Sequence, residues 1–331
     1  MNRNLIGRVV PLALVLLAGC PSAKKEPAGP TASQSAFRTA PRVAPTENVV
    51  AAVVSASAGP AEQVIPPLDL TQYPWHADTT LDTLSVHDDL LRRVATPEGF
   101  VRVSLEEGSF GAWLRRLPLA APRTPVLSYA GGTILPGDHP HLTAVSTLDI
   151  GKGDLQQCAD AVMRLHGEWV WSRGRRDMSY RAASGTDMPY ARWERGERVV
   201  QRGQSIAWAP GAGPSKDDHA SFRKYMDAVF AWSNTVALAR QAAVVPLEQI
   251  RPGDFFILPG NPGHTVLVLD LAKDAEGKQV ALLGQSYMPA QSFHVLRPRR
   301  DAIWFAMDPA VGGVQTPFWP KPFPWSSLRR L

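Results

Sequence analysis

Residues 251–285 read RPGDFFILPGNPGHTVLVLDLAKDAEGKQVALLGQ, and this stretch predicts three consecutive β-strands. Apolar, β-branched and leucine-rich runs alternate with segments dense in Pro, Gly, Asn and Asp. The strands are expected at Phe255–Leu258, His264–Leu271 and Gln279–Gln285, with turns at 259–263 and 273–277. Turns this short join antiparallel neighbours, so the stretch favours an antiparallel sheet.

The second turn allows a prediction of strand register. If it centres between Asp274 and Ala275, then Asp270 pairs with Gln279 and His264 pairs with Gln285. Directly opposed residues share one face of a sheet and lie about 5 Å apart. The sequence therefore predicts a histidine with an amide beside it. A register shift of one residue would separate the two side chains.

A helix is predicted upstream, in GDLQQCADAVMRLHGEWV, residues 153–170. Asp154 is expected as the N-cap, with Gln157 three residues later in a capping-box arrangement. One face carries residues at three- and four-residue steps: Leu155, Cys158, Ala159, Val162, Leu165, His166 and Trp169. Cys158 thus lies both on an apolar face and in the first turn.

Cys158 is one of only two cysteines in the chain, and its role has two interpretations. A cysteine on an apolar helix face is usually core packing. A helix N-terminus favours a thiolate, but by only about 0.3–1 kcal/mol, which is less than one pKa unit. A reactive thiol therefore needs a second partner such as a histidine. His166 lies about 12 Å further along the helix axis, whereas His264 could approach from the sheet.

The order of these residues resembles the NlpC-type branch of papain-like cysteine hydrolases. The matching positions are Cys158, Pro252–Asp254, Gly263–His264 and Gln285. The resemblance implies an α+β fold, with a papain-like core at about 150–300 whose cysteine-bearing helix packs on an antiparallel sheet. It implies Cys158 as nucleophile, His264 as general base and Gln285 as the group that orients the imidazole. Ala159-Asp160 replaces the Ser-Gly usual in that family.

The resemblance implies hydrolysis or acyl transfer at peptide or amide bonds of peptidoglycan. It implies no cofactor and no metal. His139 and His141 form an isolated HxH pair, which is weak evidence for metal binding. A catalytically inactive binding or scaffold protein on the same fold is the alternative, with Cys158 in the core.

A wider resemblance covers most of the chain and is to an uncharacterised bacterial lipoprotein family, domain of unknown function 4846. It rests on five segments: LQQCADAVMRL (155–165), YARWERGERV (190–199), FRKYMDAVFAW (222–232), GDFFILPGNPGHTVLVLDLA (253–272) and LLGQSYMPAQ (282–291). It implies export and a lipid anchor, and it implies no established activity.

Residues 175–245 form a predicted helical insertion, much of it aromatic and basic. Tyr190, Trp193 and Tyr287 are the candidate substrate-binding side chains. Helical spacing in the same region equally favours a core role for its aromatic residues. Both alternatives stay open, and an N-terminal lobe before residue 150 is expected to complete the fold.

The N-terminus predicts export. Residues 1–20 contain Arg3 and Arg8, a short apolar run and the lipobox-like Leu17–Cys20, so Cys20 is the expected lipidation site. Pro21 favours the outer membrane, on its periplasmic side. Residues 21–66 are rich in Ala, Pro and Ser and are expected to form a flexible tether about 35–40 Å long, before a folded domain at 67–331.

The net charge is +5 and the pI is about 9.4. No nucleic-acid-binding motif accompanies the basic clusters, so a solvated basic face is expected and a nucleic-acid partner is not. The expected partners are membrane lipid, through Cys20, and peptidoglycan.

Overall fold

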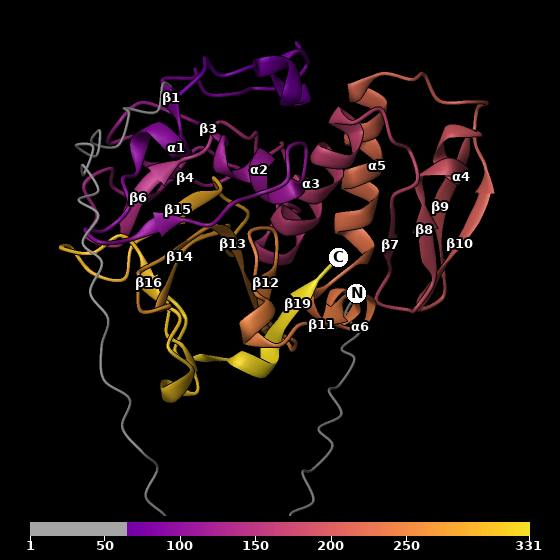
Figure 1. The fold of residues 1–331 in the computed structure, drawn as a ribbon. Coiled ribbons are helices and arrows are strands. Elements are labelled where there is room, and N and C mark those ends of the chain that lie inside the picture. Colours follow the sequence, from indigo (N-terminus) through magenta and orange to yellow (C-terminus); the bar gives the residue numbers. More distant parts are fainter. Residues whose placement is uncertain (1–64) are drawn as a thin grey trace, which may run out of the picture. The chain divides into compact units, whose positions relative to one another are not determined.

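The computed structural model describes residues 65–331, and its centre is an antiparallel sheet with helices packed against it (Figure 1). The sheet order is β11 (Ala243–Val244), β19 (Leu328–Arg330), β12 (Phe255–Leu258), β13 (His264–Lys273), β14 (Gln279–Gln285), β15 (His294–Leu296) and β6 (Leu142–Val145). Strand β2 (Val101–Arg102) also pairs with β13, and β16 (Phe305–Ala306) with β14. The prediction of an α+β fold with an antiparallel sheet is confirmed. The leader with Cys20, and the tether up to residue 64, lie outside the described residues.

The predicted register between β13 and β14 is wrong. Asp270 pairs with Leu282 rather than with Gln279, because the connecting turn centres on Glu276 and not between Asp274 and Ala275, so that Lys273 pairs with Gln279. The register then shifts again at a β-bulge between Val268 and Asp270. Because side chains alternate between faces, the first error alone would have placed His264 and Gln285 on opposite faces.

The bulge restores their common face. It inserts Leu269 as an extra residue, so Val268 pairs with Leu283 and the pairing continues one position displaced towards His264. Bulges re-aim side chains in this way and are frequent next to active sites. His264 and Gln285 therefore lie diagonally on one face instead of directly opposite each other.

Helix α3 (Cys158–Ser172) packs against β13 and β14, with α2 (Phe110–Arg115) and α5 (His219–Trp232) beside it. It begins later than predicted, because Gln157 and not Asp154 is the N-cap. The Asp154 carboxylate instead accepts hydrogen bonds from the Ala290 amide and the Gln157 side chain. Cys158 is consequently the first residue of the helix.

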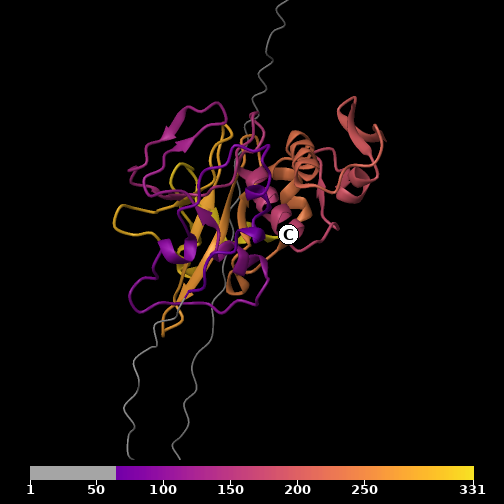
Figure 2. The ribbon, with the colours of Figure 1, turned by 90° about the horizontal axis from the view of Figure 1, so that it is seen from above.

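The stretch of chain between α3 and β11 contains strands as well as helices, whereas the sequence predicted a helical insertion. Its elements are β7 (Ser179–Arg181), β8 (Asp187–Pro189), α4 (Tyr190–Glu194), β9 (Glu197–Arg202), β10 (Ser205–Pro210), α5 and α6 (Thr235–Gln241). Figures 1 and 2 show the β9–β10 hairpin projecting beyond α5, away from the sheet.

Short elements complete the described fold. The part before α3 contains β1 (Asp88–Asp89), α1 (Leu90–Arg93), β3 (Pro118–Leu119), β4 (Val126–Leu127) and β5 (Thr133–Leu135). Near the C-terminus, β17 (Gly313–Val314) and β18 (Phe323–Pro324) form a hairpin. The 3₁₀-helices are Leu70–Gln72, Pro74–His76, Leu247–Gln249, Pro309–Val311 and Trp325–Ser327. Within residues 65–331, every helix is too short or too polar to cross a membrane.

Candidate functional site

Cys158 lies where the start of α3 meets the start of β13. Its thiol is 3.9 Å from the carbonyl oxygen of Gly263, and the Thr265 amide also points at the sulfur. The side chain is only 5% exposed. Burial, with a smaller contribution from the neighbouring Asp160 carboxylate, raises the pKa of the Cys158 thiol to about 12.

His264 and Gln285 form the predicted pair despite the changed register. His264 Nε2 donates a hydrogen bond of 2.8 Å to Gln285 Oε1. The other ring nitrogen, Nδ1, is buried and has no hydrogen-bond partner in the described structure. Burial lowers the pKa of His264 to about 4, so the imidazole is neutral at neutral pH and Nδ1 carries a free lone pair.

The thiol and the imidazole are neighbours without being bonded. The Cys158 sulfur contacts the backbone directly before and after His264, yet no hydrogen bond joins Sγ to Nδ1. Thr265 Oγ1 and Asp160 Oδ1 are also buried without a protein partner. Buried polar atoms without a partner are rare in folded proteins, so the three on His264, Thr265 and Asp160 favour this region as a functional site candidate.

Asp160 occupies one of the two positions after Cys158 where Ser-Gly was expected, and it has a structural role at the start of α3. Its Oδ2 accepts a hydrogen bond from the Gln157 amide and so closes the capping box at the start of α3. Burial raises the pKa of this carboxyl to about 8. Asp160 is therefore largely protonated and uncharged at neutral pH, which limits its repulsion of a thiolate at Cys158.

A loop between β17 and β18, residues 315–322, covers the imidazole, and we call it the cover loop. The indole of Trp319 stacks on the His264 ring at a centroid distance of 4.9 Å and an interplanar angle of 27°. Tyr287 meets His264 edge-on at 4.7 Å, and its hydroxyl donates to the Phe318 carbonyl at 3.2 Å. Thus Tyr287 lies at the site, as expected of a candidate substrate-binding residue.

The other two candidate substrate-binding residues do not face a groove. Tyr190 is fully buried and Trp193 is 8% exposed. Both pack against Tyr225 of α5, with ring centroids 5.0 and 6.0 Å away. Both side chains therefore contribute to core packing, which is the alternative that the sequence left open for them.

His294 lies at the same site, although the sequence did not predict it. It comes from β15, is fully buried, and its Nε2 lies 3.5 Å from Gln285 Nε2. The available signal was a second histidine shortly after the predicted third strand. His139 and His141 instead contact each other and Phe318 at the outer side of the cover loop. Among residues 65–331, no cluster of three or more His, Cys, Asp or Glu residues is arranged to hold a metal ion.

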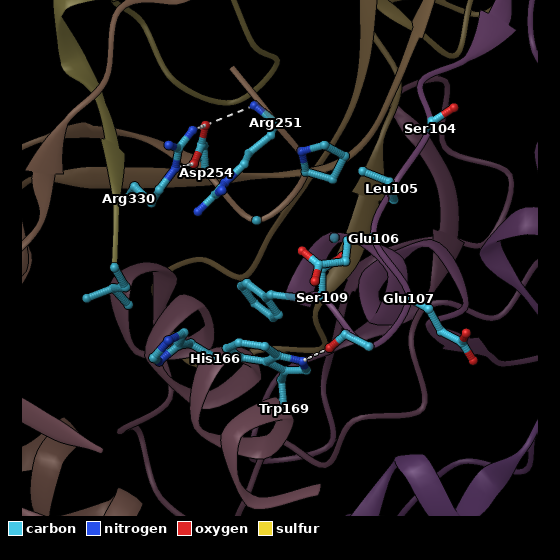
Figure 3. Close-up of a pocket in the computed structure, with 16 residues that line it drawn as sticks. Ser104, Leu105, Glu106, Glu107, Ser109, His166, Trp169, Arg251, Asp254 and Arg330 are labelled. Atoms are coloured by element: carbon cyan, nitrogen blue, oxygen red, sulfur yellow. Dashed lines mark hydrogen bonds and ion pairs between the residues drawn. The ribbon is translucent and has the colours of Figure 1, made fainter. Parts of the chain in front are cut away.

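A separate pocket of about 580 Å³ lies near the other end of α3 (Figure 3). His166 and Trp169 of α3, together with Phe110, form an aromatic wall, with ring centroids 5.3–5.8 Å apart. Arg251 lies on the opposite side and Glu106 between them. Neither charged residue forms an ion pair with another described residue, so both are available to a ligand.

Comparison with known proteins gives one match. The family model described as "Domain of unknown function (4846)" matches residues 90–330. No curated protein and no solved structure matches the chain.

Proposed function

The chain belongs to the family of domain of unknown function 4846, and we propose that it is a cysteine hydrolase or acyltransferase with Cys158 as nucleophile. The substrate class is a peptide or amide bond of the cell envelope, with peptidoglycan as the polymer. Cys20 carries a lipid that anchors the protein in the outer membrane, facing the periplasm. The core is papain-like, of the NlpC type.

The observation that carries the proposal is the hydrogen bonding of the two ring nitrogens of His264. Its Nε2–H is committed to Gln285, and this leaves Nδ1 as a buried base without a partner. The thiol of Cys158 lies against the preceding carbonyl, that of Gly263. A nucleophile, a base and a group that orients the base are the parts that thiol-dependent acyl transfer requires.

The reaction follows from these positions. His264 Nδ1 accepts the thiol proton as the sulfur of Cys158 attacks the amide carbon. Backbone N–H groups at the start of α3 stabilise the oxyanion, and the C–N bond breaks as the amine takes the proton from the imidazolium. Water then attacks the thioester with His264 again accepting a proton, which returns to the departing sulfur. An amine in place of water gives transfer instead of hydrolysis.

The described structure is the closed form of this site. The buried thiol points at Gly263, and Trp319 covers the imidazole. Reaction therefore requires the cover loop to move and the thiol to rotate towards His264 Nδ1. The loop suits such movement, because Thr316 Oγ1 and Trp319 Nε1 are buried without protein partners while Gln315 and Pro320–Pro322 are exposed.

The test is the pH profile of Cys158 alkylation in the full chain, followed by mass spectrometry of the Cys158 peptide. We expect the wild type to react below pH 7 through its open form, and His264→Ala to lose this reaction. His87→Ala, at an exposed histidine, is the control and should match the wild type. If Cys158 is alkylated slowly, only above about pH 8.5 and at the same rate in His264→Ala, the proposed catalytic function is wrong.

A second candidate function is ligand binding without catalysis. Two observations favour it: the thiol is buried, with a pKa raised to about 12, and a separate pocket lies near the other end of α3. Peptidoglycan fragments would then bind at the pocket wall formed by His166 and Trp169. In that case Arg251→Ala should weaken binding, Cys158→Ala should not, and no fragment should be cleaved.

A further inference from the structure

A chain of hydrogen bonds extends from His264 through Gln285 to a second histidine. His264 Nε2 bonds to Gln285 Oε1 at 2.8 Å, and Gln285 Nε2 lies 3.5 Å from His294 Nε2. His294 Nδ1 in turn lies 3.0 Å from the carbonyl oxygen of Ser292. The members from Gln285 to Ser292 are at most 3% exposed, so water does not replace their protein partners.

The direction of every bond follows from the Ser292 end. A carbonyl oxygen only accepts, so His294 Nδ1 must carry the proton. At neutral pH burial keeps His294 uncharged, with its pKa lowered to about 4, and Nε2 is therefore an acceptor. Gln285 must then turn its NH₂ group towards His294 and its oxygen towards His264.

We propose that His294 is a positioning residue that fixes the orientation of the Gln285 amide and thereby the tautomer of His264. This inference rests on the proposed function, because it assigns the proton arrangement that the reaction needs. With the amide so oriented, His264 carries its proton on Nε2 and offers Nδ1 as the base.

The reversed amide shows what His294 prevents. Gln285 Oε1 would then face the lone pair of His294 Nε2, and its NH₂ group would face His264 Nε2. His264 would have to carry its proton on Nδ1, where no base would remain for the thiol. The loss of a correctly protonated general base reduces rates by about 10²–10⁴-fold.

The direct test is the tautomer of His264 in the full chain, read from ¹⁵N shifts of the imidazole nitrogens. The wild type should show the Nε2–H form alone. His294→Phe, which keeps a buried ring without an acceptor, should show a mixture or the Nδ1–H form. His294→Gln places an amide oxygen where Nε2 was and should restore the wild-type tautomer. A His264 that stays fully Nε2–H in a folded His294→Phe protein would overturn the inference.

A second background separates the orientation of the Gln285 amide from any other effect of His294→Phe. In Gln285→Glu, both oxygens accept, so the orientation of the group no longer matters. Adding His294→Phe there should leave the His264 tautomer unchanged, and a change would contradict the positioning role.

Cys158 reactivity separates this inference from the proposed function. If the tautomer moves and alkylation below pH 7 falls by about 10²-fold or more, both hold. If the tautomer moves in a protein whose wild type shows no His264-dependent reactivity, the proposed function fails and the positioning role of His294 stands.

Discussion

The acidity of Cys158 depends on a single neighbouring carboxyl as well as on burial. Asp160 has a pKa raised to about 8 by burial, so it becomes an anion beside the thiol only in alkaline solution. We expect Asp160→Asn to lower the pKa of Cys158 and to speed alkylation above pH 8, while leaving the rate below pH 7 nearly unchanged. Alkylation rates from pH 6 to 10 measure this.

Asn is the appropriate replacement because its side-chain oxygen can still accept from the Gln157 amide. Asp160→Ala is the matched control: it also removes the charge but loses the cap, which costs about 0.5–2 kcal/mol of stability. Superimposable profiles for Asp160→Asn and the wild type above pH 8 would show that the carboxyl has no electrostatic effect on the thiol.

Single residues also show how much of the candidate site could be predicted from the sequence. Cys158, His264 and Gln285 were predicted as a group because turn residues and strand runs fix their order along the chain, and His264 and Gln285 do form a hydrogen bond. His294 was not, because its place depends on the pairing of β15 with both β14 and β6. For Tyr190 the sequence left a core role and a binding role open, since aromatic residues suit both, and the packing against Tyr225 of α5 places it in the core.

At the scale of elements, counting along the sequence predicted that His264 and Gln285 share a face, although the register it assumed was wrong. The strands β12, β13 and β14 were predicted almost to the residue, since turn residues bound each of them. The bulge at Leu269 was not predicted, because Val268, Leu269 and Asp270 are all fully buried, so no exposed side chain marks the change of face. Local pattern fixes strands, whereas tertiary contacts fix their irregularities.

The cover loop yields a prediction at this scale. Trp319→Ala removes the ring that stacks on His264, and we expect Cys158 alkylation at pH 7 to rise by about tenfold or more, since losing an aromatic pair of about 0.5–1.5 kcal/mol and its buried area favours opening. Strain assists, because Phe318 holds a φ of 71°, a region unfavourable for a bulky residue.

Trp208→Ala controls for the loss of a large ring. Trp208 lies on β10, where Arg192 stacks over it, and it does not contact the site. It should leave Cys158 alkylation at the wild-type rate. If Trp319→Ala also leaves the rate unchanged, the cover loop does not limit access to the thiol.

Helix α3 is held in place by a buried arginine. Arg164 is fully buried and bonds to the carboxylates of Asp149 and Glu168, as well as to Gln156 Oε1 at 2.9 Å. Arg164→Ala removes a buried cation from both carboxylates and leaves Asp149 with Arg223 and Glu168 with His219 as the remaining partners. We expect the free energy of unfolding to fall by about 3–5 kcal/mol. Urea unfolding measures the change.

The matched control lies close to the C-terminal end of the same helix. Arg175 pairs with Asp177, but both side chains are more than half exposed, at 51% and 65%. Arg175→Ala should therefore cost at most about 1 kcal/mol. Similar losses for the two variants would mean that the buried cluster contributes no more than a surface pair.

At the scale of the whole molecule, one histidine joins three distant parts of the chain. His219 of α5 donates from Nδ1 to Asp78 at 2.8 Å and from Nε2 to Glu168 of α3 at 2.9 Å. Carboxylates only accept, so both ring nitrogens must carry protons and His219 is an imidazolium. Burial is the largest single effect and opposes this charge, but the charge of Glu168 and the hydrogen bonds to Glu168 and Asp78 together outweigh it, so the pKa of His219 is raised.

The raised pKa of His219 determines how its contribution to stability changes with pH. A pKa raised in the folded state gives stability that is complete below the unfolded value of about 6.5 and is lost as pH rises through the folded value. Asp78 and Glu168 have lowered pKa values, so they stay ionised throughout this range, and nearby Arg164 keeps its charge. We therefore expect the stability advantage of the wild type over His219→Gln to be largest at pH 5.5–6.5 and to shrink in alkaline solution.

Urea unfolding of the full chain from pH 5.5 to 9 tests this, with His87→Gln as the exposed-histidine control. Above the folded pKa, one imidazole nitrogen loses its proton and faces a carboxylate as a second acceptor, so the bridge between α5, α3 and the Asp78 segment becomes repulsive on one side. A wild-type advantage that is constant across this pH range would mean that His219 is neutral in the folded protein, and that packing rather than charge joins the three parts.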